Sequence, residues 1–453
     1  MNIASLRSLR PGTKVLFACV PLDGHFNPLT ALARHLVEKG CDVRWYTSMH
    51  YREKVERLGV RFYPLQGAKD IYAADINDVF PERAALKGQV KKLVFDLTHA
   101  FILRAPEYYD DLCAIRSEWK FDALVCDIAF GAVPLVADLM RVPVFAMGIL
   151  PLTESSRDLP PAGLGMTPAT TFFGRRRQDI LRFVANKLLF AKPNRLMVRV
   201  LAERGVQASG SNVFDCNSRK ATRLLQSGTP SFEYFRSDLG RNVRFVGALL
   251  PWRKPANGPS WFDERLNQYD KVLLVTQGTV ERDCGKLLEP LLKAFRNTDC
   301  LVVVTTGGSG TQDLRNKYGG DNVIIEDFIP FGDVLPYADV YVTNGGYGGV
   351  LLALEHGVPL VTAGVHEGKN EICARVGYFE LGINLRTETP TAVQLREAVD
   401  KVLSCGVYVN NAQKMAAEIA RYPSNEICEH YMAELLGARP LLQNSEKEAE
   451  NVF

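Results

Sequence analysis

Short apolar runs alternate with segments of helical periodicity along this chain, and this alternation constrains the fold more than any other feature. Residues 15–20 form an uninterrupted apolar run, typical of a strand buried on both faces. A helix is expected to follow, from its N-cap Asn27 to Gly40. The same order starts again in the second half, with a predicted strand at 271–276 and a helical pattern at 287–295. Strands that alternate with helices predict parallel sheets covered by helices, the α/β class.

Length and the repeated pattern together predict two domains. The chain has 453 residues, more than one domain usually contains. Prolines, a glycine and an asparagine at 251–262 predict a linker between the two patterns. We therefore expect an N-terminal domain over 1–250 and a C-terminal domain over 263–425. Residues 426–453 are expected to form a helix that packs back on the first domain, followed by a polar tail.

Composition and charge argue against several classes of protein. The formal net charge is only +3, so no nucleic-acid partner is expected. The longest apolar region, 123–152, is interrupted by Asp127, Asp138 and Arg141, so no integral membrane segment is expected. The ten cysteines are scattered without a C-x-x-C pair, which favours reduced, buried thiols in a cytoplasmic protein.

One long segment, 155–177, has no clear periodicity and is rich in proline, glycine, threonine and arginine. We interpret it as a loop or lid over a ligand. The arginines at 175–177 are expected to lie in a solvated part of this loop, with a weak membrane-surface patch as the alternative. This segment and residues 70–80 hold aromatic and apolar side chains, which are compatible with an aromatic or lipophilic ligand.

The most informative motif is the glycine-rich run at 343–350, TNGGYGGV, between a predicted strand and a short helix that runs to His356. Glycines let backbone amides approach an anion, and a helix N-terminus adds a favourable dipole. A diphosphate is the natural ligand of such a loop. A tight turn that binds nothing is the alternative.

This run belongs to an ordered set of motifs that resembles the nucleotide-sugar glycosyltransferases of the GT-B fold, which include plant UDP-glycosyltransferases and bacterial macrolide glycosyltransferases. The motifs are GHFNP at 24–28, TQGT at 276–279, FIPF at 328–331, NGGYGG at 344–349, HGVP at 356–359 and ARV at 374–376. The resemblance spans nearly the whole chain, and HEGKNE at 366–371 resembles a microbial branch of the family. It implies two Rossmann-like, doubly wound domains that face each other across a cleft, the first binding the acceptor and the second the nucleotide sugar.

The resemblance implies a catalytic pair formed by His25 and Asp127. A histidine in the G-H-x-x-P loop is the family's general base, and imidazole titrates near neutrality. Asp127 would orient His25 and stabilise the imidazolium. Without the resemblance, His25 is a loop histidine and Asp127 a strand-end cap. Asp23, Gly24 and Phe26 are expected to contact the acceptor.

The donor site is expected in the loops of the second domain. Phe328 is expected to stack on the nucleobase and Ile329 to pair with it through its backbone, although Phe328 is alternatively a core side chain. The diphosphate would lie against the glycine run, with Glu367 and Lys369 near the sugar hydroxyls or the diphosphate. The expected donor residues are Gln277, Gly278, Thr279, Phe328, Ile329, Asn344, Gly345, Gly346, Tyr347, Gly348, Gly349, Glu367 and Lys369.

Five positions depart from the family pattern. Asn344 stands where a histidine usually contacts a phosphate, and an asparagine adds a hydrogen bond but no charge. Gly349 replaces a threonine or serine, and residues 368–369 replace an Asp-Gln pair that holds sugar hydroxyls. Leu352 replaces an acidic residue that contacts the ribose. These departures leave the sugar specificity open.

The predicted activity is inverting, metal-independent transfer of a hexose from a UDP-sugar, with UDP-glucose as the expected donor, to a hydroxyl of a small aromatic or lipophilic acceptor. The seven histidines are dispersed and no D-x-D cluster occurs, so neither a metal site nor a further cofactor is expected. A dTDP-deoxysugar transferase of a macrolide or polyketide pathway, and a non-catalytic glycosyltransferase-like partner protein, are the alternatives. A monomer or homodimer is expected.

Overall fold

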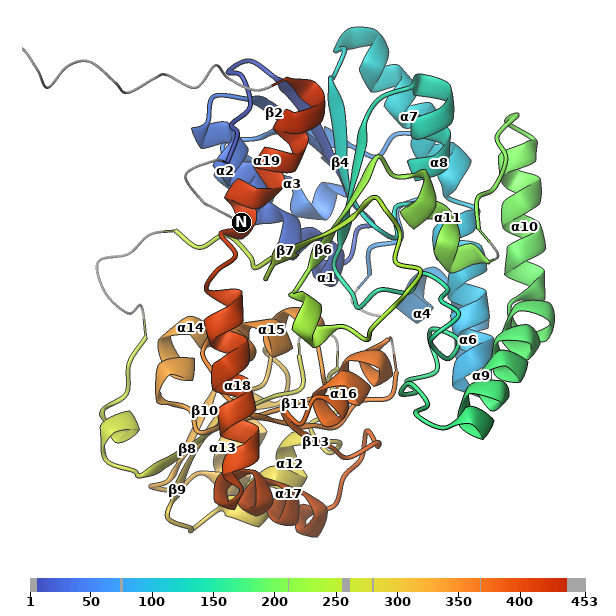
Figure 1. Ribbon diagram of the computed structural model, residues 1–453. Helices are drawn as coiled ribbons and strands as arrows, with labels where there is room; N and C mark the ends of the chain where they lie inside the picture. The colour runs from blue at the N-terminus through green and yellow to red at the C-terminus, as the bar shows by residue number, and fades with distance from the viewer. Residues whose placement is uncertain are drawn as a thin grey trace, which may run out of the picture.

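Two parallel β-sheets, one in each half of the chain, organise the fold (Figure 1). The computed structural model describes residues 6–73, 76–210, 212–254, 261–278, 281–366 and 368–437. Within this part of the chain the first sheet has seven strands in the order β3-β2-β1-β4-β5-β6-β7, and the second has six in the order β10-β9-β8-β11-β12-β13. The strands are β1 (Lys14–Ala18), β2 (Asp42–Thr47), β3 (Arg61–Pro64), β4 (Ala123–Asp127), β5 (Val144–Gly148), β6 (Arg223–Ser227), β7 (Val243–Gly247), β8 (Lys271–Thr276), β9 (Cys300–Thr305), β10 (Val323–Glu326), β11 (Val340–Thr343), β12 (Leu360–Thr362) and β13 (Gly382–Asn384).

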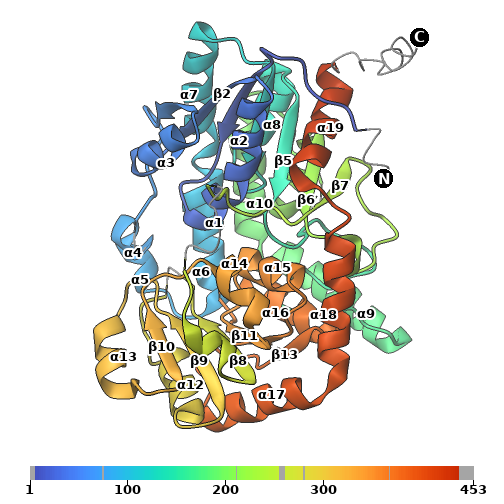
Figure 2. The ribbon, with the colours of Figure 1, turned by 90° about the vertical axis from the view of Figure 1, so that its left-hand side faces the viewer.

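Helices connect the strands and cover both faces of each sheet (Figures 1 and 2). The α-helices are α1 (Asp23–Phe26), α2 (Thr30–Glu38), α3 (Arg52–Arg57), α4 (Ile76–Val79), α5 (Pro81–Ala84), α6 (Gln89–Asp96), α7 (Ala105–Glu118), α8 (Val133–Leu135), α9 (Phe172–Val184), α10 (Ala191–Ala202), α11 (Val213–Lys220), α12 (Leu288–Phe295), α13 (Thr311–Tyr318), α14 (Phe331–Val334), α15 (Tyr347–Glu355), α16 (Lys369–Tyr378), α17 (Ala392–Ser404), α18 (Gly406–Ile419) and α19 (Ser424–Leu436). Short 3₁₀ or π segments are η2 (Asn27–Leu29), η3 (Met49–Tyr51), η4 (Leu97–Ile102), η5 (Val136–Met140), η6 (Ala185–Leu189), η7 (Pro230–Phe232), η8 (Glu264–Asn267) and η9 (Leu335–Tyr337). The predicted α/β fold of two doubly wound domains is confirmed.

Each sheet contains one point at which the strand order reverses. In the first sheet this point lies between β1 and β4, and in the second between β8 and β11. Connections that leave two such strands diverge to opposite sides of the sheet and open a crevice at the carboxyl ends of the strands, where ligands of this fold class bind. His25, Asp127, Gly278 and Asn344 lie at or just beyond the ends of these four strands. The topology therefore places them at the two crevices.

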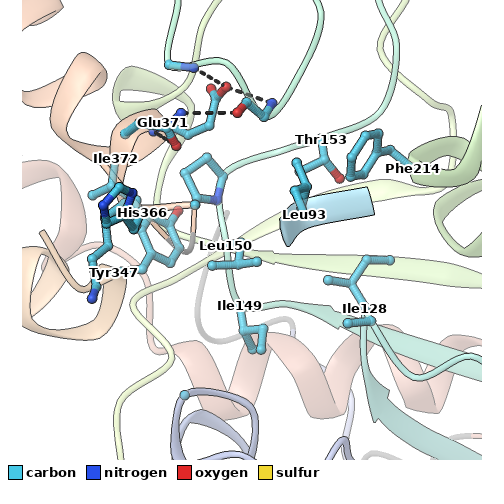
Figure 3. Close-up of a pocket in the computed structure, with 18 of the residues that line it drawn as sticks. Leu93, Ile128, Ile149, Leu150, Thr153, Phe214, Tyr347, His366, Glu371 and Ile372 are labelled. Carbon is cyan, nitrogen blue, oxygen red and sulfur yellow. Dashed lines mark hydrogen bonds between the residues drawn. The ribbon is translucent and has the colours of Figure 1, made fainter. Parts of the chain in front are cut away.

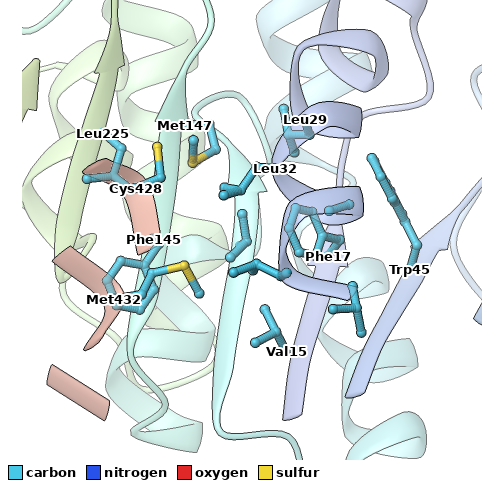
Figure 4. Close-up of a cluster of buried hydrophobic side chains, with 14 of the residues drawn as sticks. Val15, Phe17, Leu29, Leu32, Trp45, Phe145, Met147, Leu225, Cys428 and Met432 are labelled. Atoms are coloured by element: carbon cyan, nitrogen blue, oxygen red, sulfur yellow. The ribbon is translucent and has the colours of Figure 1, made fainter. Parts of the chain in front are cut away.

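The C-terminal helix α19 packs on the first domain. Figure 4 shows Cys428 and Met432 of α19 with Phe145 and Leu225 in one buried apolar cluster. The carboxylate of Glu429 on α19 is 2.8 Å from His35 Nε2 and accepts a hydrogen bond from the backbone N–H of Leu9 at 2.9 Å. Helix α18, by contrast, packs in the core of the second domain. The chain therefore returns from the second domain to the first between α18 and α19.

The strands appear where they were expected, and β8 matches its predicted bounds at both ends. The predicted loop at 155–177 is wrong in its last part. Helix α9 begins at Phe172, because the Thr171 hydroxyl accepts a hydrogen bond from Gly174 N at 3.1 Å and caps it. The arginines at 175–177 therefore lie on a helix.

The start of the first helix is also corrected. Residues Asp23–Phe26 form a helical turn, and Asn27 has helical backbone angles (φ −58°, ψ −42°), so Asn27 is not an N-cap. His25 consequently lies in the first helical turn after β1. Part of the predicted linker, 255–260, and the predicted tail from 438 lie outside the described residues. In the part of the chain that the structure describes, no helix is both long and apolar enough to cross a membrane. All ten cysteines are free, and seven of them are buried.

Candidate active site

A cavity of about 2330 Å³ lies between the two domains and is lined by residues of both. Pockets for one small ligand are usually about 300–1,000 Å³. The cavity therefore has room for two substrates side by side. Both crevices open into it, since His25 lines it from the first domain and Gly346 lines it from the second.

His25 and Asp127 form a hydrogen-bonded pair at the first crevice. Nδ1 of His25 lies 2.8 Å from Oδ1 of Asp127, which is fully buried, while the His25 side chain is 14% exposed. The Asp127 carboxylate also accepts hydrogen bonds from the backbone N–H groups of Val20 at 2.8 Å and Ala129 at 2.9 Å. These two bonds fix the orientation of the carboxylate. With its Nδ1 proton donated to Asp127, His25 carries on Nε2 the lone pair that a general base needs.

Two buried thiols near Asp127 stay neutral. Burial, and after it the charge of Asp127, raise the pKa of the Cys19 thiol to about 12. The same two causes raise the pKa of the Cys126 thiol well above its ordinary value. Asp127 is therefore the anion nearest to His25 in a buried, neutral setting, which strengthens its interaction with an imidazolium.

The three expected acceptor residues have different surroundings. Gly24 and Asp23 line the cavity, but the Asp23 carboxylate accepts hydrogen bonds from the Tyr51 hydroxyl at 3.3 Å and from Lys54 Nζ at 3.4 Å. Phe26 is 1% exposed and stacks on Tyr51 with ring centroids 4.2 Å apart. The Phe26 side chain thus anchors the loop to the core and does not line the cavity.

Apolar side chains of the first domain form a wall of the cavity. Figure 3 shows Leu93, Ile128, Ile149, Leu150 and Phe214 along it. None of these residues belongs to the sequence motifs. Ile128 and Ile149 directly follow β4 and β5, and this position at the carboxyl end of a parallel strand is the signal that could have found them.

The glycines at 345–349 fall into two groups. The fold itself requires Gly345, which has φ +87° and whose Cβ would overlap the Cys373 sulfur. A Cβ at Gly349 would lie 2.8 Å from the Tyr341 hydroxyl, which explains why no threonine or serine stands there. At Gly346 and Gly348 a Cβ would meet no atom within 4 Å. Packing therefore does not require glycine at 346 and 348, and a ligand could approach the backbone closely there.

Helix α15 begins at Tyr347, so the N–H groups of its first turn have no partner within the helix. Gly346, Gly348 and Gly349 line the cavity at this end, and the helix dipole favours an anion there. The Tyr347 side chain points elsewhere, because its hydroxyl donates a hydrogen bond to the Ser227 carbonyl of the first domain at 2.8 Å. Tyr347 thus joins the domains through its side chain, and only its backbone is placed to meet a diphosphate.

The two loops at the second crevice are tied together. The Asn344 side-chain amide donates a hydrogen bond to the carbonyl of Gln277, and Gly278, with φ +78°, lies against the same amide. Asn344 therefore acts as a link between the loops. Thr279 and Glu367 lie outside the described residues.

The expected nucleobase residues lie at the end of β10. Phe328 is 67% exposed, so its alternative as a core side chain is wrong. A Cβ on Gly308 would be 3.6 Å from the Phe328 ring, which places the ring over the loop after β9. Ile329 is buried, at 6% exposure. An exposed ring above a glycine loop is suited to stacking on a planar ligand, although neither residue lines the cavity itself.

Comparison with known proteins identifies the family. The family model described as "Erythromycin biosynthesis protein CIII-like, C-terminal domain" matches residues 289–435. The 4'-demethylrebeccamycin synthase of Lentzea aerocolonigenes is 36% identical over 410 residues, which cover 90% of this chain and 96% of that protein. The chain is a natural-product glycosyltransferase of the GT-B fold. UDP-glycosyltransferase 2 of Phaeomoniella chlamydospora is 31% identical over 418 residues, covering 89% and 91% of the two chains. The crystal structure of the kitacinnamycin glycotransferase shares the fold, with a TM-score of 0.72 at 20% identity, covering 94% of this chain and 100% of that one.

Positive charge in the glycosyltransferase cavity comes partly from residues that sequence analysis did not select. Arg282, Lys286 and Arg386 line it together with Lys369, the first residue of α16. Lys286 forms ion pairs with Glu281 and, at 3.9 Å, with Glu388. Asn344 carries no charge, so positive charge at the cavity comes from these side chains, of which Lys286 is paired with two carboxylates. Among the described residues no group of three or more His, Cys, Asp or Glu side chains is arranged to hold a metal ion.

Helix α16 fastens a loop of the first domain over the cavity (Figure 3). One Glu371 oxygen accepts hydrogen bonds from the N–H groups of Gly163 and Gly165, both at 2.9 Å. Arg375, 1% exposed, pairs with Glu371 at 3.2 Å and with Glu233 of the first domain. Burial opposes the charge of Arg375, but the two carboxylates outweigh it and raise the pKa of the guanidinium. The segment predicted as a loop or lid is therefore fixed to the second domain.

Proposed function

We propose that this glycosyltransferase moves a hexose from UDP-glucose to a hydroxyl of a small aromatic or lipophilic acceptor, with inversion at the anomeric carbon and without a metal ion. One observation carries the proposal: the His25–Asp127 pair and the N-terminus of α15 open into the same cavity from opposite domains. A base and an anion site that face one space are what a displacement at a nucleotide sugar requires.

The proposed reaction is a single displacement. His25 Nε2 takes the proton of the acceptor hydroxyl while the acceptor oxygen forms a bond to the anomeric carbon. The bond from that carbon to the diphosphate oxygen breaks on the opposite face, and UDP leaves with the electron pair. Asp127 holds the Nδ1 proton and stabilises the imidazolium that forms. Attack opposite the leaving group inverts the anomeric configuration.

The donor assignment has two supports. The N–H groups at the start of α15, with Arg282, Lys286 and Lys369, offer charge that suits a diphosphate without a metal ion. The name of the 31% identical relative, UDP-glycosyltransferase 2, favours uridine over thymidine, with a dTDP-sugar as the alternative. The apolar wall favours an aromatic or lipophilic acceptor, because burial of such a molecule against it removes apolar surface from water.

Calorimetric titration of the protein with UDP and dTDP, with and without EDTA, tests the donor site. Tighter binding of UDP that persists in EDTA is expected, whereas loss of binding in EDTA would refute metal independence. Gly348→Asp places a carboxylate in the open space at the start of α15 and should abolish UDP binding. Gly406→Asp is the matched control, since Gly406 is an exposed first residue of another helix, α18, and should bind UDP normally.

Turnover with UDP-glucose and a panel of aromatic and lipophilic alcohols tests the reaction. UDP-glucose carries an α-linkage, so inversion should give a β-glucoside, recognised by the large coupling constant of its anomeric proton in NMR. An α-glucoside would refute the single displacement. UDP binding without turnover on any acceptor would favour the non-catalytic partner protein.

A further inference from the structure

The segment from α9 to α10 exposes an unusual amount of apolar surface. Among the described residues seventeen large apolar side chains are exposed, and six of them lie within 172–198. These six are Phe172, Phe173, Ile180, Phe183, Leu188 and Val198, with exposed fractions of 52% to 84%. Single exposed apolar residues are common, whereas a concentration of them on one segment points to a surface that contacts a partner.

The apolar side chains of α9 share one face. Phe173, Ile180 and Phe183 are spaced by seven and three residues, which places them on one side of the helix. The other side faces the protein, since Gln178 is buried and Leu181 lines the cavity. Helix α9 lies at the periphery of the molecule in both views (Figures 1 and 2). Its apolar face is therefore presented outward.

The same segment is strongly basic. Residues 171–200 contain eight lysines and arginines and one acid, Asp179, in a chain whose net charge is only +3. Arg175, Arg176 and Lys187 are exposed, and the Arg176 guanidinium lies 5.5 Å from the centre of the Phe172 ring. Two copies of this surface would repel each other, so its charge disfavours self-association. Anionic surfaces are its complement.

We propose that residues 171–199 form a docking surface for an anionic lipid bilayer. A helix with aromatic and aliphatic side chains on one face, flanked by lysines and arginines, lies in the plane of a membrane interface. The apolar face would enter the boundary between headgroups and acyl chains, and the basic side chains would meet the anionic headgroups. The sequence left a weak membrane-surface patch at 175–177 as an alternative, and the exposed apolar face of α9 supports that alternative.

The docking surface adjoins the cavity. Gly174, Gln178 and Leu181 of α9 line the cavity with their inner side. A protein that rests on a bilayer through α9 therefore holds the acceptor compartment next to the lipid phase. A lipophilic acceptor dissolved in the bilayer would then reach the apolar wall without crossing bulk water. This delivery step rests on the proposed function, whereas the docking does not.

Co-sedimentation of the full chain with vesicles, in the absence of any nucleotide sugar, tests the docking. The protein should bind vesicles of phosphatidylcholine mixed with phosphatidylglycerol, bind phosphatidylcholine alone much more weakly, and release as salt is added. Failure to bind the anionic vesicles would overturn the proposal. An inactive enzyme can still bind, and an active one can fail to bind, so the outcome is independent of the proposed reaction.

Two variants separate the charged and apolar contributions. Arg175→Gln/Arg176→Gln/Lys187→Gln should lower vesicle partitioning roughly 100-fold, since each basic residue near an anionic surface contributes about fivefold. Phe173→Ser/Phe183→Ser should lower it about tenfold or more, because two apolar side chains no longer enter the interface. None of these residues lines the cavity, so turnover on a water-soluble acceptor should stay unchanged.

Matched controls lie on exposed helices of the second domain. Lys293→Gln/Lys401→Gln/Lys414→Gln removes the same charge from α12, α17 and α18, and Val393→Ser/Val407→Ser removes exposed apolar groups from α17 and α18. Both controls should bind vesicles like the wild type, and an equal loss in the controls would refute the assignment to α9. If Phe173→Ser/Phe183→Ser instead converts a dimer to a monomer in size-exclusion chromatography, the surface joins two copies and the proposal falls.

Discussion

Asp127→Asn changes one atom of a buried side chain and tests the base assignment directly. In one orientation the asparagine oxygen still accepts from His25 and Ala129, but its NH₂ group then faces the N–H of Val20, donor against donor. In the other orientation the NH₂ group faces His25 and Ala129. His25 must then accept on Nδ1 and carry its proton on Nε2, where it no longer acts as a base.

Both orientations remove the negative charge that stabilises the imidazolium. We expect kcat to fall about 10³- to 10⁴-fold, the range for loss of a correctly oriented base. The opposed donor in either orientation should also cost about 1–3 kcal/mol of the free energy of unfolding. Initial rates of UDP release at saturating acceptor measure the first effect, and thermal unfolding measures the second.

Asp111→Asn is the matched control. Asp111 is also a buried carboxylate of the first domain, 6% exposed, and accepts hydrogen bonds from the Tyr46 hydroxyl at 2.7 Å and from the N–H groups of Gln66 at 2.9 Å and Gly67 at 2.7 Å. It does not line the cavity, so Asp111→Asn should lose stability and keep its kcat. Equal losses of kcat in the two variants, or an unchanged kcat in Asp127→Asn, would refute the assignment.

Three further changes have expected outcomes. Gly348→Ala should raise the Tm, because alanine is favoured over glycine in a helix by up to about 1 kcal/mol. It should also weaken UDP binding in calorimetry, because its methyl group enters the space where a diphosphate would approach. Arg375→Met should cost about 3–5 kcal/mol in urea unfolding, because the buried carboxylate of Glu233 loses its partner; an unchanged midpoint would contradict this. Burial alone would raise the pKa of Glu429, but the hydrogen bonds from His35 and from the Leu9 N–H lower it below its ordinary 4.5. This carboxylate therefore stabilises the fold above pH 4.5 and loses that contribution as the pH falls below it. Glu429→Gln should therefore flatten the plot of the free energy of unfolding against pH in this range. An unchanged slope would argue against the pairing.

The sheets were predictable because the interiors of buried parallel strands are apolar, as residues 272–275 of β8 and 340–342 of β11 are. Helix α9 was missed for a physical reason. Its apolar side chains face outward, as Phe173 does, while Gln178 faces inward, so the usual relation between apolar periodicity and burial does not hold there. The sequence signal for the start of α9 is Thr171, whose hydroxyl caps the helix.

The site was predictable where it consists of motifs and was not where it depends on contacts. His25 and Asp127 each follow a recognisable strand, and the topology joins them. The Arg375–Glu233 pair connects positions 142 residues apart in different domains, and no local pattern reports it. Tyr347 lies within a glycine run, yet its hydroxyl reaches Ser227 of the other domain, a direction that only the packed structure reveals.

The return of α19 to the first domain makes that domain discontinuous in sequence. Its fold is built from the chain before β8 and from the last helix, so the second domain, from Lys271 to Ile419, is topologically an insertion with two junctions. A chimaera that exchanges donor specificity between relatives must therefore replace an internal cassette and retain the recipient's own α19. A single crossover after β7 would instead import a foreign α19, whose Cys428 and Met432 counterparts would have to fit a core with which they did not evolve.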